Sequence, residues 1–191
     1  MPVPQALHPY AERQQLHEIL DWYHGIADAL LEHRASVQRS MRDNHRVSGR
    51  FAGMTEADVD THFDAQRREL DRLTILNLVA CAEAEIVTDY ERRVRGKLKD
   101  PLSRAYQTWH KSMKAKMQLR PAFDEPGILG VLKKSKVINN HIIGDYRSCL
   151  QARHWLGHGR RWDKPVAVDR FDPEDVYVRA QTLVSALAAV A

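Results

Sequence analysis

The segment Leu73–Gly96, "LTILNLVACAEAEIVTDYERRVRG", belongs to a long predicted helix. Its apolar residues recur at helical spacing, at Leu76, Val79, Ile86 and Tyr90. This spacing predicts one face of an amphipathic helix. The helix is expected to begin after Thr55, because Thr55 can cap it and Asp58 stands three residues later, as in a capping box. The expected end is Gly96, which makes this one long element.

The same periodicity predicts helices on both sides of this element. The expected segments are a helix from Leu16 to about Arg42, one beginning at Asp100 and Pro101, a short one from Gly127 to about Lys136, one from Ile138 to Gly157, and a last one beginning at Asp172 and Pro173. No segment alternates as a β-strand does. The short connections favour an all-α, antiparallel bundle of about five to six helices.

The polar stretch "RDNHRVSGRFAG", residues 42–53, is the best candidate for a loop or an internal boundary. It would divide the chain into an N-terminal helix and loop, residues 1–50, and a helical domain, residues 51–191. One single domain over residues 1–191 is the alternative.

The composition is that of a folded protein in a reducing compartment. The 191 residues are 43% hydrophobic and 28% charged, with a formal net charge of +4. Cys81 and Cys149 lie in apolar helical patterns without a C-x-x-C motif, which favours reduced thiols and a cytoplasmic location. The N-terminus lacks the pattern of a signal peptide, and no apolar run reaches the length of a membrane span. We therefore expect no membrane association.

The charged residues between Arg92 and Arg120 are almost all basic. The basic residues are Arg92, Arg93, Arg95, Lys97, Lys99, Arg104, Lys111, Lys114, Lys116 and Arg120, and Asp100 is the only acid among them. A run of one sign raises the local potential and favours contacts with phosphate, whereas a solvated helical surface usually mixes signs. The pattern favours RNA as a partner, and Arg92, Arg93, Arg95 and Lys97 are candidate contacts.

Two charged residues stand where the helical pattern predicts core residues. Arg153 continues the apolar row of Tyr146 and Leu150, and Glu83 lies in the apolar row of the long helix. A pair between Glu83 and Arg153 would account for both charges. Such a pair is either a purely structural salt bridge or a device that orients Arg153 beside a phosphate, and both interpretations stay open.

The string "RHWLGHGRRW", Arg153–Trp162, combines an arginine, a polar residue and a second histidine near a helix end. In an all-α chain it resembles the R-x4-6-H signature of HEPN domains, the helical nucleotide-binding domains of higher eukaryotes and prokaryotes. The longer string "DYRSCLQARHWLGHG" resembles a bacterial HEPN branch with an "RHWLAHG" motif, and "KDPLSRAY" is similar to the same branch. The resemblance covers the chain from about Thr55 to the C-terminus.

The resemblance implies a metal-independent endoribonuclease without a cofactor, or a catalytically silent relative. It assigns Arg153 and His158 as the catalytic pair and His154 as the accessory polar residue. Two chains of active members pair through this region, so it also implies a homodimer with a composite site. The corresponding setting is phage defence or a toxin–antitoxin system with an antitoxin protein as partner.

These residue types suit RNA cleavage. A 2′-hydroxyl can attack the adjacent phosphorus if one group accepts its proton and another protonates the 5′-oxygen, and histidine can do either near neutral pH. Arg153 would stabilise the developing charge, and Arg160 and Arg161 would hold flanking phosphates. Arg153 and His158 do not share a face of a straight helix, but Gly157 and Gly159 allow the chain to turn there. The products would be a 2′,3′-cyclic phosphate and a 5′-hydroxyl, and DNA would not be cut.

Two other classes of function are compatible with the motif. His154 and His158 are four residues apart, a spacing used by zinc sites, although Trp155 stands where H-E-x-x-H has glutamate. A third ligand for a zinc-dependent hydrolase would have to come from elsewhere, such as His62, His110 or His141. The other alternative is a non-catalytic HEPN-like module that binds RNA or a protein.

Overall fold

The structure is a computed structural model that describes residues 14–43, 47, 49–115, 121–163, 168 and 170–190. Over these residues it consists of helices and turns without β-strands, as the sequence predicts. The elements are α1 (Leu16–Arg42), the 3₁₀ helix η1 (Gly49–Phe51), α2 (Glu56–Arg95), α3 (Pro101–Ala115), α4 (Ile128–Ser135), α5 (Asn140–Gly157) and α6 (Pro173–Ala188). None of these helices is long and apolar enough to cross a membrane.

Helix α2 is 40 residues long and has the predicted bounds. At its start, the Asp58 amide donates to Thr55 Oγ1 (3.2 Å) and the Thr55 amide donates to Asp58 Oδ2 (2.9 Å), which completes the capping box. At its end, Lys97 adopts a left-handed conformation (φ 48°) and the Leu98 amide donates to the Arg93 carbonyl (3.3 Å). This is the geometry of a Schellman motif with lysine where glycine is usual.

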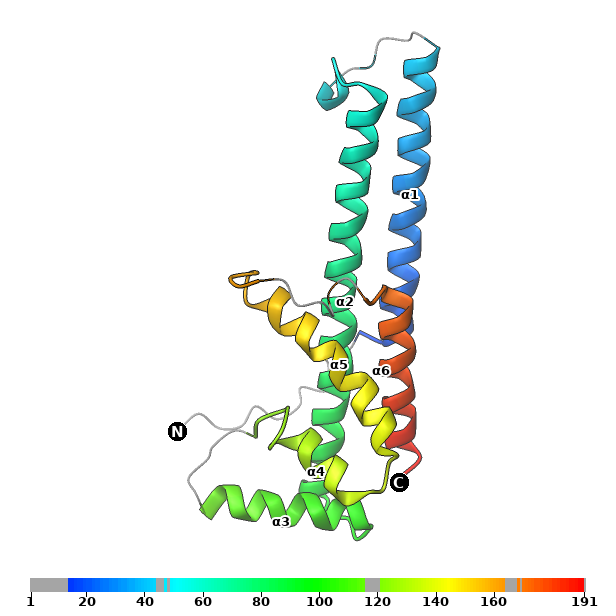
Figure 1. Cartoon of the computed structure of the whole chain (residues 1–191). Coiled ribbons are helices and arrows are strands. Elements are labelled where there is room, and N and C mark those ends of the chain that lie inside the picture. Colours follow the sequence, from blue (N-terminus) through cyan, green and yellow to red (C-terminus); the bar gives the residue numbers. More distant parts are fainter. Residues whose placement is uncertain are drawn as a thin grey trace.

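Helices α1 and α2 form a hairpin whose far half rises above the other helices (Figure 1). The tip of this hairpin has its own apolar cluster of Val37, Phe51, Val59 and Phe63. The stacked rings of Phe51 and Phe63 lie 5.7 Å apart, so η1 closes the tip between the two helices. The near end of α1 contributes Leu16 and Ile19 to the main core. The boundary near residue 51 remains a prediction.

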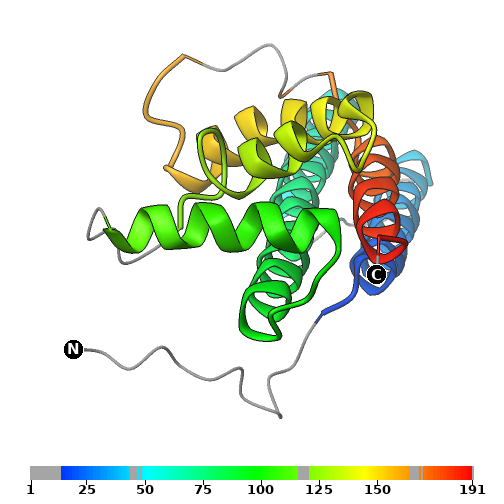
Figure 2. The ribbon, with the colours of Figure 1, turned by 90° about the horizontal axis from the view of Figure 1, so that it is seen from below.

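The main core lies where the other helices surround the second half of α2. Figure 2 shows α3 crossing the end of the molecule, with α6 next to it and α1 partly hidden behind α6. Each helix from α2 to α6 supplies fully buried side chains, among them Ile86, Tyr106, Ile128, Tyr146 and Leu183. The Tyr146 hydroxyl donates to the Val79 carbonyl (3.1 Å), which joins α5 to α2 and satisfies a buried polar group. This packing fixes the position of α5, on which the candidate site lies.

Candidate functional site at the end of helix α5

Helix α5 ends at Gly157 with a Schellman motif. Gly159 has a φ of 73°, and the Arg160 amide donates to the Trp155 carbonyl (3.0 Å) across the turn. The His158 amide donates to the His154 carbonyl (3.0 Å), so His158 is the last residue held by the helix. The left-handed conformation at Gly159 lets the chain turn immediately after His158, as the glycines of the motif predict.

His154 and His158 lie together at this exposed end. Their ring centroids are 6.3 Å apart, and the His158 ring is 5.8 Å from the ring of Trp162. The Trp155 indole N–H donates to the Trp162 carbonyl (2.9 Å), which ties the loop after α5 back to the helix. The two imidazoles are therefore exposed to solvent on a helix end whose following loop is held in place by a hydrogen bond.

Arg153 pairs with Glu83, the contact that the two misplaced charges predict. Arg153 Nη2 lies 3.2 Å from Glu83 Oε2, and the side chains are 32% and 23% exposed. The pair therefore lies at the edge of the core and not deep inside it. Within the described part of the chain, Arg153 makes no hydrogen bond or ion pair with His158. Arg153, His154 and His158 of one chain therefore lie at the same end of α5, and no hydrogen bond or ion pair connects Arg153 to His158.

The two arginines that follow the motif have different surroundings. Arg160 pairs with Glu69 on α2, and its guanidinium lies 5.6 Å from the centre of the Trp155 ring. Arg161 is exposed. Arg160 therefore fastens the end of α5 to α2, and a phosphate would have to share it with Glu69.

The Glu69–Arg160 pair makes the stability of this end depend on pH. The hydrogen bond from Arg160 lowers the pKa of Glu69 in the folded protein. Stabilisation by this carboxylate is therefore complete above the usual pKa of glutamate, about 4.3, and is lost as the pH falls through the lower folded-state pKa. We expect Glu69→Gln to cost less than about 1 kcal/mol of unfolding free energy at pH 7, because the pair is partly exposed.

The measurement is urea unfolding of wild type and Glu69→Gln over a range of acid pH. The difference between the two proteins should shrink steadily below about pH 5. A difference that stays constant down to about pH 2 would show that the pair does not stabilise the fold through its charge.

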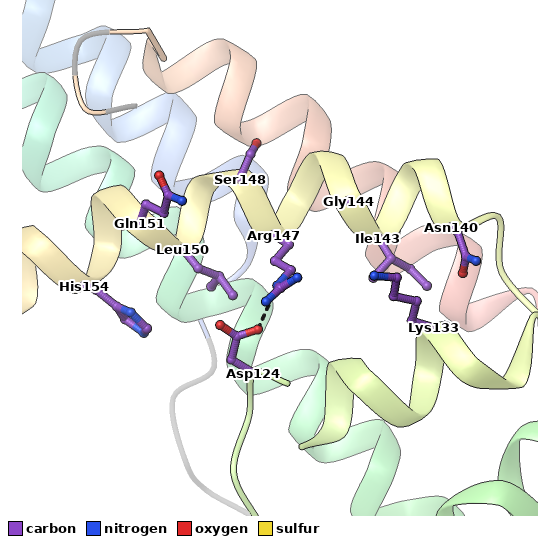
Figure 3. A pocket seen from close by; sticks show the side chains of 10 residues that line it. All are labelled: Asp124, Lys133, Asn140, Ile143, Gly144, Arg147, Ser148, Leu150, Gln151 and His154. Atoms are coloured by element: carbon purple, nitrogen blue, oxygen red, sulfur yellow. Dashed lines mark hydrogen bonds and ion pairs between the residues drawn. The ribbon is translucent and has the colours of Figure 1, made fainter. Parts of the chain in front are cut away.

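His154 also lines a pocket of about 380 Å³ that runs along α5 (Figure 3). Arg147 lies on the same face of the helix, and its Nε donates to Asp124 Oδ1 (3.0 Å) in the loop before α4. Arg147 and Asp124 are not among the site residues that the sequence predicts. Arg147 stands seven residues before His154, a spacing that places two residues on one helix face, and this signal could have found it.

The structure corrects one residue of the predicted RNA surface. Arg93 is fully buried, with Nε 2.6 Å from Asp89 Oδ2 and Nη1 3.0 Å from Asp100 Oδ1. Its Nη2 also donates to the Leu187 carbonyl (3.4 Å) of α6. The prediction that Arg93 contacts RNA is therefore wrong, because the guanidinium is enclosed and already paired. Arg93 continues the buried row of Ile86 and Tyr90 on α2.

The other candidates at the end of α2 are exposed. Arg92 pairs with Asp89 (2.7 Å) and Arg95 pairs with Glu91 (3.2 Å). Lys97 is exposed at the left-handed position after the helix. Their contact with RNA stays a prediction, and two of the three share their charge with a carboxylate.

The histidines suggested as a third zinc ligand lie elsewhere in the fold. His62 lies beside Phe51 at the tip of the hairpin, His110 Nδ1 is 2.7 Å from the Tyr90 hydroxyl, and His141 Nδ1 is 3.6 Å from Asp145 Oδ1. Over the residues that the structure places, no three His, Cys, Asp or Glu side chains are grouped so as to hold a metal ion. The zinc alternative therefore has two ligands here and lacks a third within the described chain.

No family model, curated protein or solved structure matches the chain. The features from which a function can be inferred are therefore the all-α fold, the geometry at the end of α5 and the motif residues.

Proposed function

We propose that the protein is a metal-independent endoribonuclease whose site lies at the end of α5. The observation that carries the proposal is that Arg153, held by Glu83, lies on the same helix end as the exposed pair His154 and His158. These are the residue types that cleavage by a 2′-hydroxyl needs, and their order is that of the HEPN motif. The all-α fold is consistent with that resemblance.

Each residue has a chemical role in the proposal. The Arg153 guanidinium binds the phosphoryl oxygens and stabilises the charge that develops on them, and Glu83 keeps it in one orientation. His158 transfers a proton to or from the reacting oxygens, and His154 supports it as the accessory polar group. The site uses no cofactor.

A homodimer belongs to the same proposal. The reaction needs one group to accept the 2′-proton and another to protonate the 5′-oxygen, and a second chain would supply a second His158. A facing copy would also bring a second Arg153 to the composite site. Trp162, exposed beside His158, lies on the surface that this copy would cover. By family resemblance, the setting is phage defence or a toxin controlled by an antitoxin in the cytoplasm.

The test is cleavage of RNA by the purified protein in excess EDTA, with analysis of the product ends. We expect cutting that persists in EDTA, leaves 2′,3′-cyclic phosphate and 5′-hydroxyl ends, and spares DNA of the same sequence. Cutting that EDTA abolishes and zinc restores would instead support a metal site at His154 and His158. RNA binding without cleavage of any RNA would support a non-catalytic module.

A further inference from the structure

The pocket that His154 lines is the first of three adjoining pockets. A second pocket, of about 480 Å³, shares Lys133 and Asn140 with the first. A third, of about 670 Å³, lies between α3 and α4 and shares Pro126 and Lys134 with the second. The shared residues join the three into one path from the end of α5 around α4 to α3, here named the α4 groove.

The α4 groove is lined by positive charge that is only partly neutralised. Its cations are Arg104, Lys133, Lys134, Lys136 and Arg147. Lys133 and Arg147 share Glu125, and Arg147 also binds Asp124. Arg104, Lys134 and Lys136 make no ion pair with any residue that the structure describes, and neither α3 nor α4 contains an acidic residue. The α3 end of the groove therefore has an uncompensated positive potential that attracts polyanions.

The floor of the groove is apolar where the charge is least compensated. Between α3 and α4 the lining includes Trp109, Met113 and Val131, with Arg104 on one wall and Lys134 on the other. Single-stranded nucleic acid can place bases against such a floor while its phosphates meet the cations at the rim, whereas a duplex keeps its bases stacked inside. Each pocket volume falls within the range of about 300–1,000 Å³ that ligand sites have, so the groove has room for several nucleotides.

We infer that the α4 groove binds single-stranded RNA and leads it to the His154–His158 end of α5. This inference rests on the proposed function for its direction, because the groove ends at His154 (Figure 3). It also places the RNA contacts on α3 and α4 instead of at the end of α2. At the end of α2, Arg93 is buried and Arg92 and Arg95 are paired with carboxylates.

The test compares two triple variants of the full chain. One removes the unpaired groove cations, Arg104→Ala, Lys134→Ala and Lys136→Ala. The matched control removes three exposed arginines of the hairpin that make no ion pair with a described residue, Arg39→Ala, Arg50→Ala and Arg68→Ala. Binding is measured by fluorescence anisotropy with a labelled single strand of 2′-O-methyl RNA, which cannot be cut by 2′-hydroxyl attack. Circular dichroism checks that both variants fold.

The groove variant should bind the single strand at least about tenfold more weakly at 0.15 M salt, while the control stays within about twofold of wild type. The slope of log affinity against log salt should fall in magnitude by about 2, because each lost phosphate contact on a single strand removes about 0.7. Wild type should prefer the single strand to duplex RNA of the same sequence.

The outcomes separate this inference from the nuclease proposal. If wild type cuts RNA but the groove variant binds and cuts RNA as the control does, the inference that the groove binds RNA is wrong and the nuclease proposal is supported. If no RNA is cut but RNA binding depends on the three cations, the inference that the groove binds RNA is supported and the nuclease proposal is wrong. Equal affinity for duplex RNA overturns the single-strand assignment. Loss of binding to vesicles that contain phosphatidylserine, with unchanged RNA binding, would reassign the surface to anionic membranes.

Discussion

Replacing His158 by alanine is expected to lower the rate of RNA cleavage in EDTA by about 100-fold or more. General acid–base catalysis contributes about 10²- to 10⁴-fold, and His158 is the residue assigned to the proton transfer. Its side chain is exposed at the end of α5, and the helix end is fixed by backbone hydrogen bonds that alanine would keep. The loss should therefore occur in a protein that folds normally, with an unfolding free energy within about 0.5 kcal/mol of wild type.

The same helix offers a matched control. His141 lies in the first turn of α5, and its side chain is 82% exposed. His141→Ala should cleave RNA within about twofold of wild type, because surface substitutions away from the site rarely matter. Arg153→Ala should lose activity as His158→Ala does, and Arg153→Lys should recover only part of it, since lysine lacks the planar fork. Equal activity of His158→Ala and His141→Ala would remove His158 from the mechanism.

Replacing Arg93 by alanine is expected to lower the free energy of unfolding by about 3–5 kcal/mol. The guanidinium is fully buried and joins Asp89 of α2, Asp100 before α3 and the carbonyl of Leu187 on α6. Its removal would leave a cavity where three helices meet. Among the residues that the structure describes, Asp89 would keep only the exposed Arg92 as an ion-pair partner, and Asp100 would keep only its hydrogen bonds with Ser103. Breaking a buried ion pair on one side is costly for this reason.

The neighbouring arginine provides the comparison. Arg92 pairs with the same Asp89 at 2.7 Å, but its side chain is 53% exposed. Arg92→Ala should therefore cost less than about 1 kcal/mol, as exposed pairs usually do. Urea unfolding of both variants measures the difference. Similar losses for the two variants would mean that burial does not set the strength of the Asp89 contacts.

The sequence predicts the local features of the fold and one long-range contact. The bounds of α2 follow from Thr55, Asp58 and Gly96, because caps and turns depend on neighbouring residues. The contact between Glu83 and Arg153 follows from two charges in apolar rows, since such charges need partners. Both inferences use a residue's place on a helix face together with its chemistry.

The sequence does not predict features that depend on how the helices pack, and the charge of a residue alone does not predict whether it is exposed. The basic run places Arg93 among the candidate RNA contacts, although its position in the row of Ile86 and Tyr90 favours burial. The α4 groove depends on how α3 crosses the end of α2 and on contacts such as Arg147–Asp124, which joins residues 23 positions apart. No periodic pattern within one helix specifies such an arrangement.

The hairpin of α1 and α2 carries two apolar clusters besides the main core, one at its tip and one around Tyr23, Ala27 and Leu70. The tip cluster around Phe51 and Phe63 belongs to the far end of α2, whereas the site on α5 depends on the near end. Segments with separate cores can open independently, so amide protons of the tip can exchange through local opening that leaves the α5 end closed. The tip is consequently a suitable attachment point for a reporter domain, because it lies at the opposite end of α2 from the proposed site.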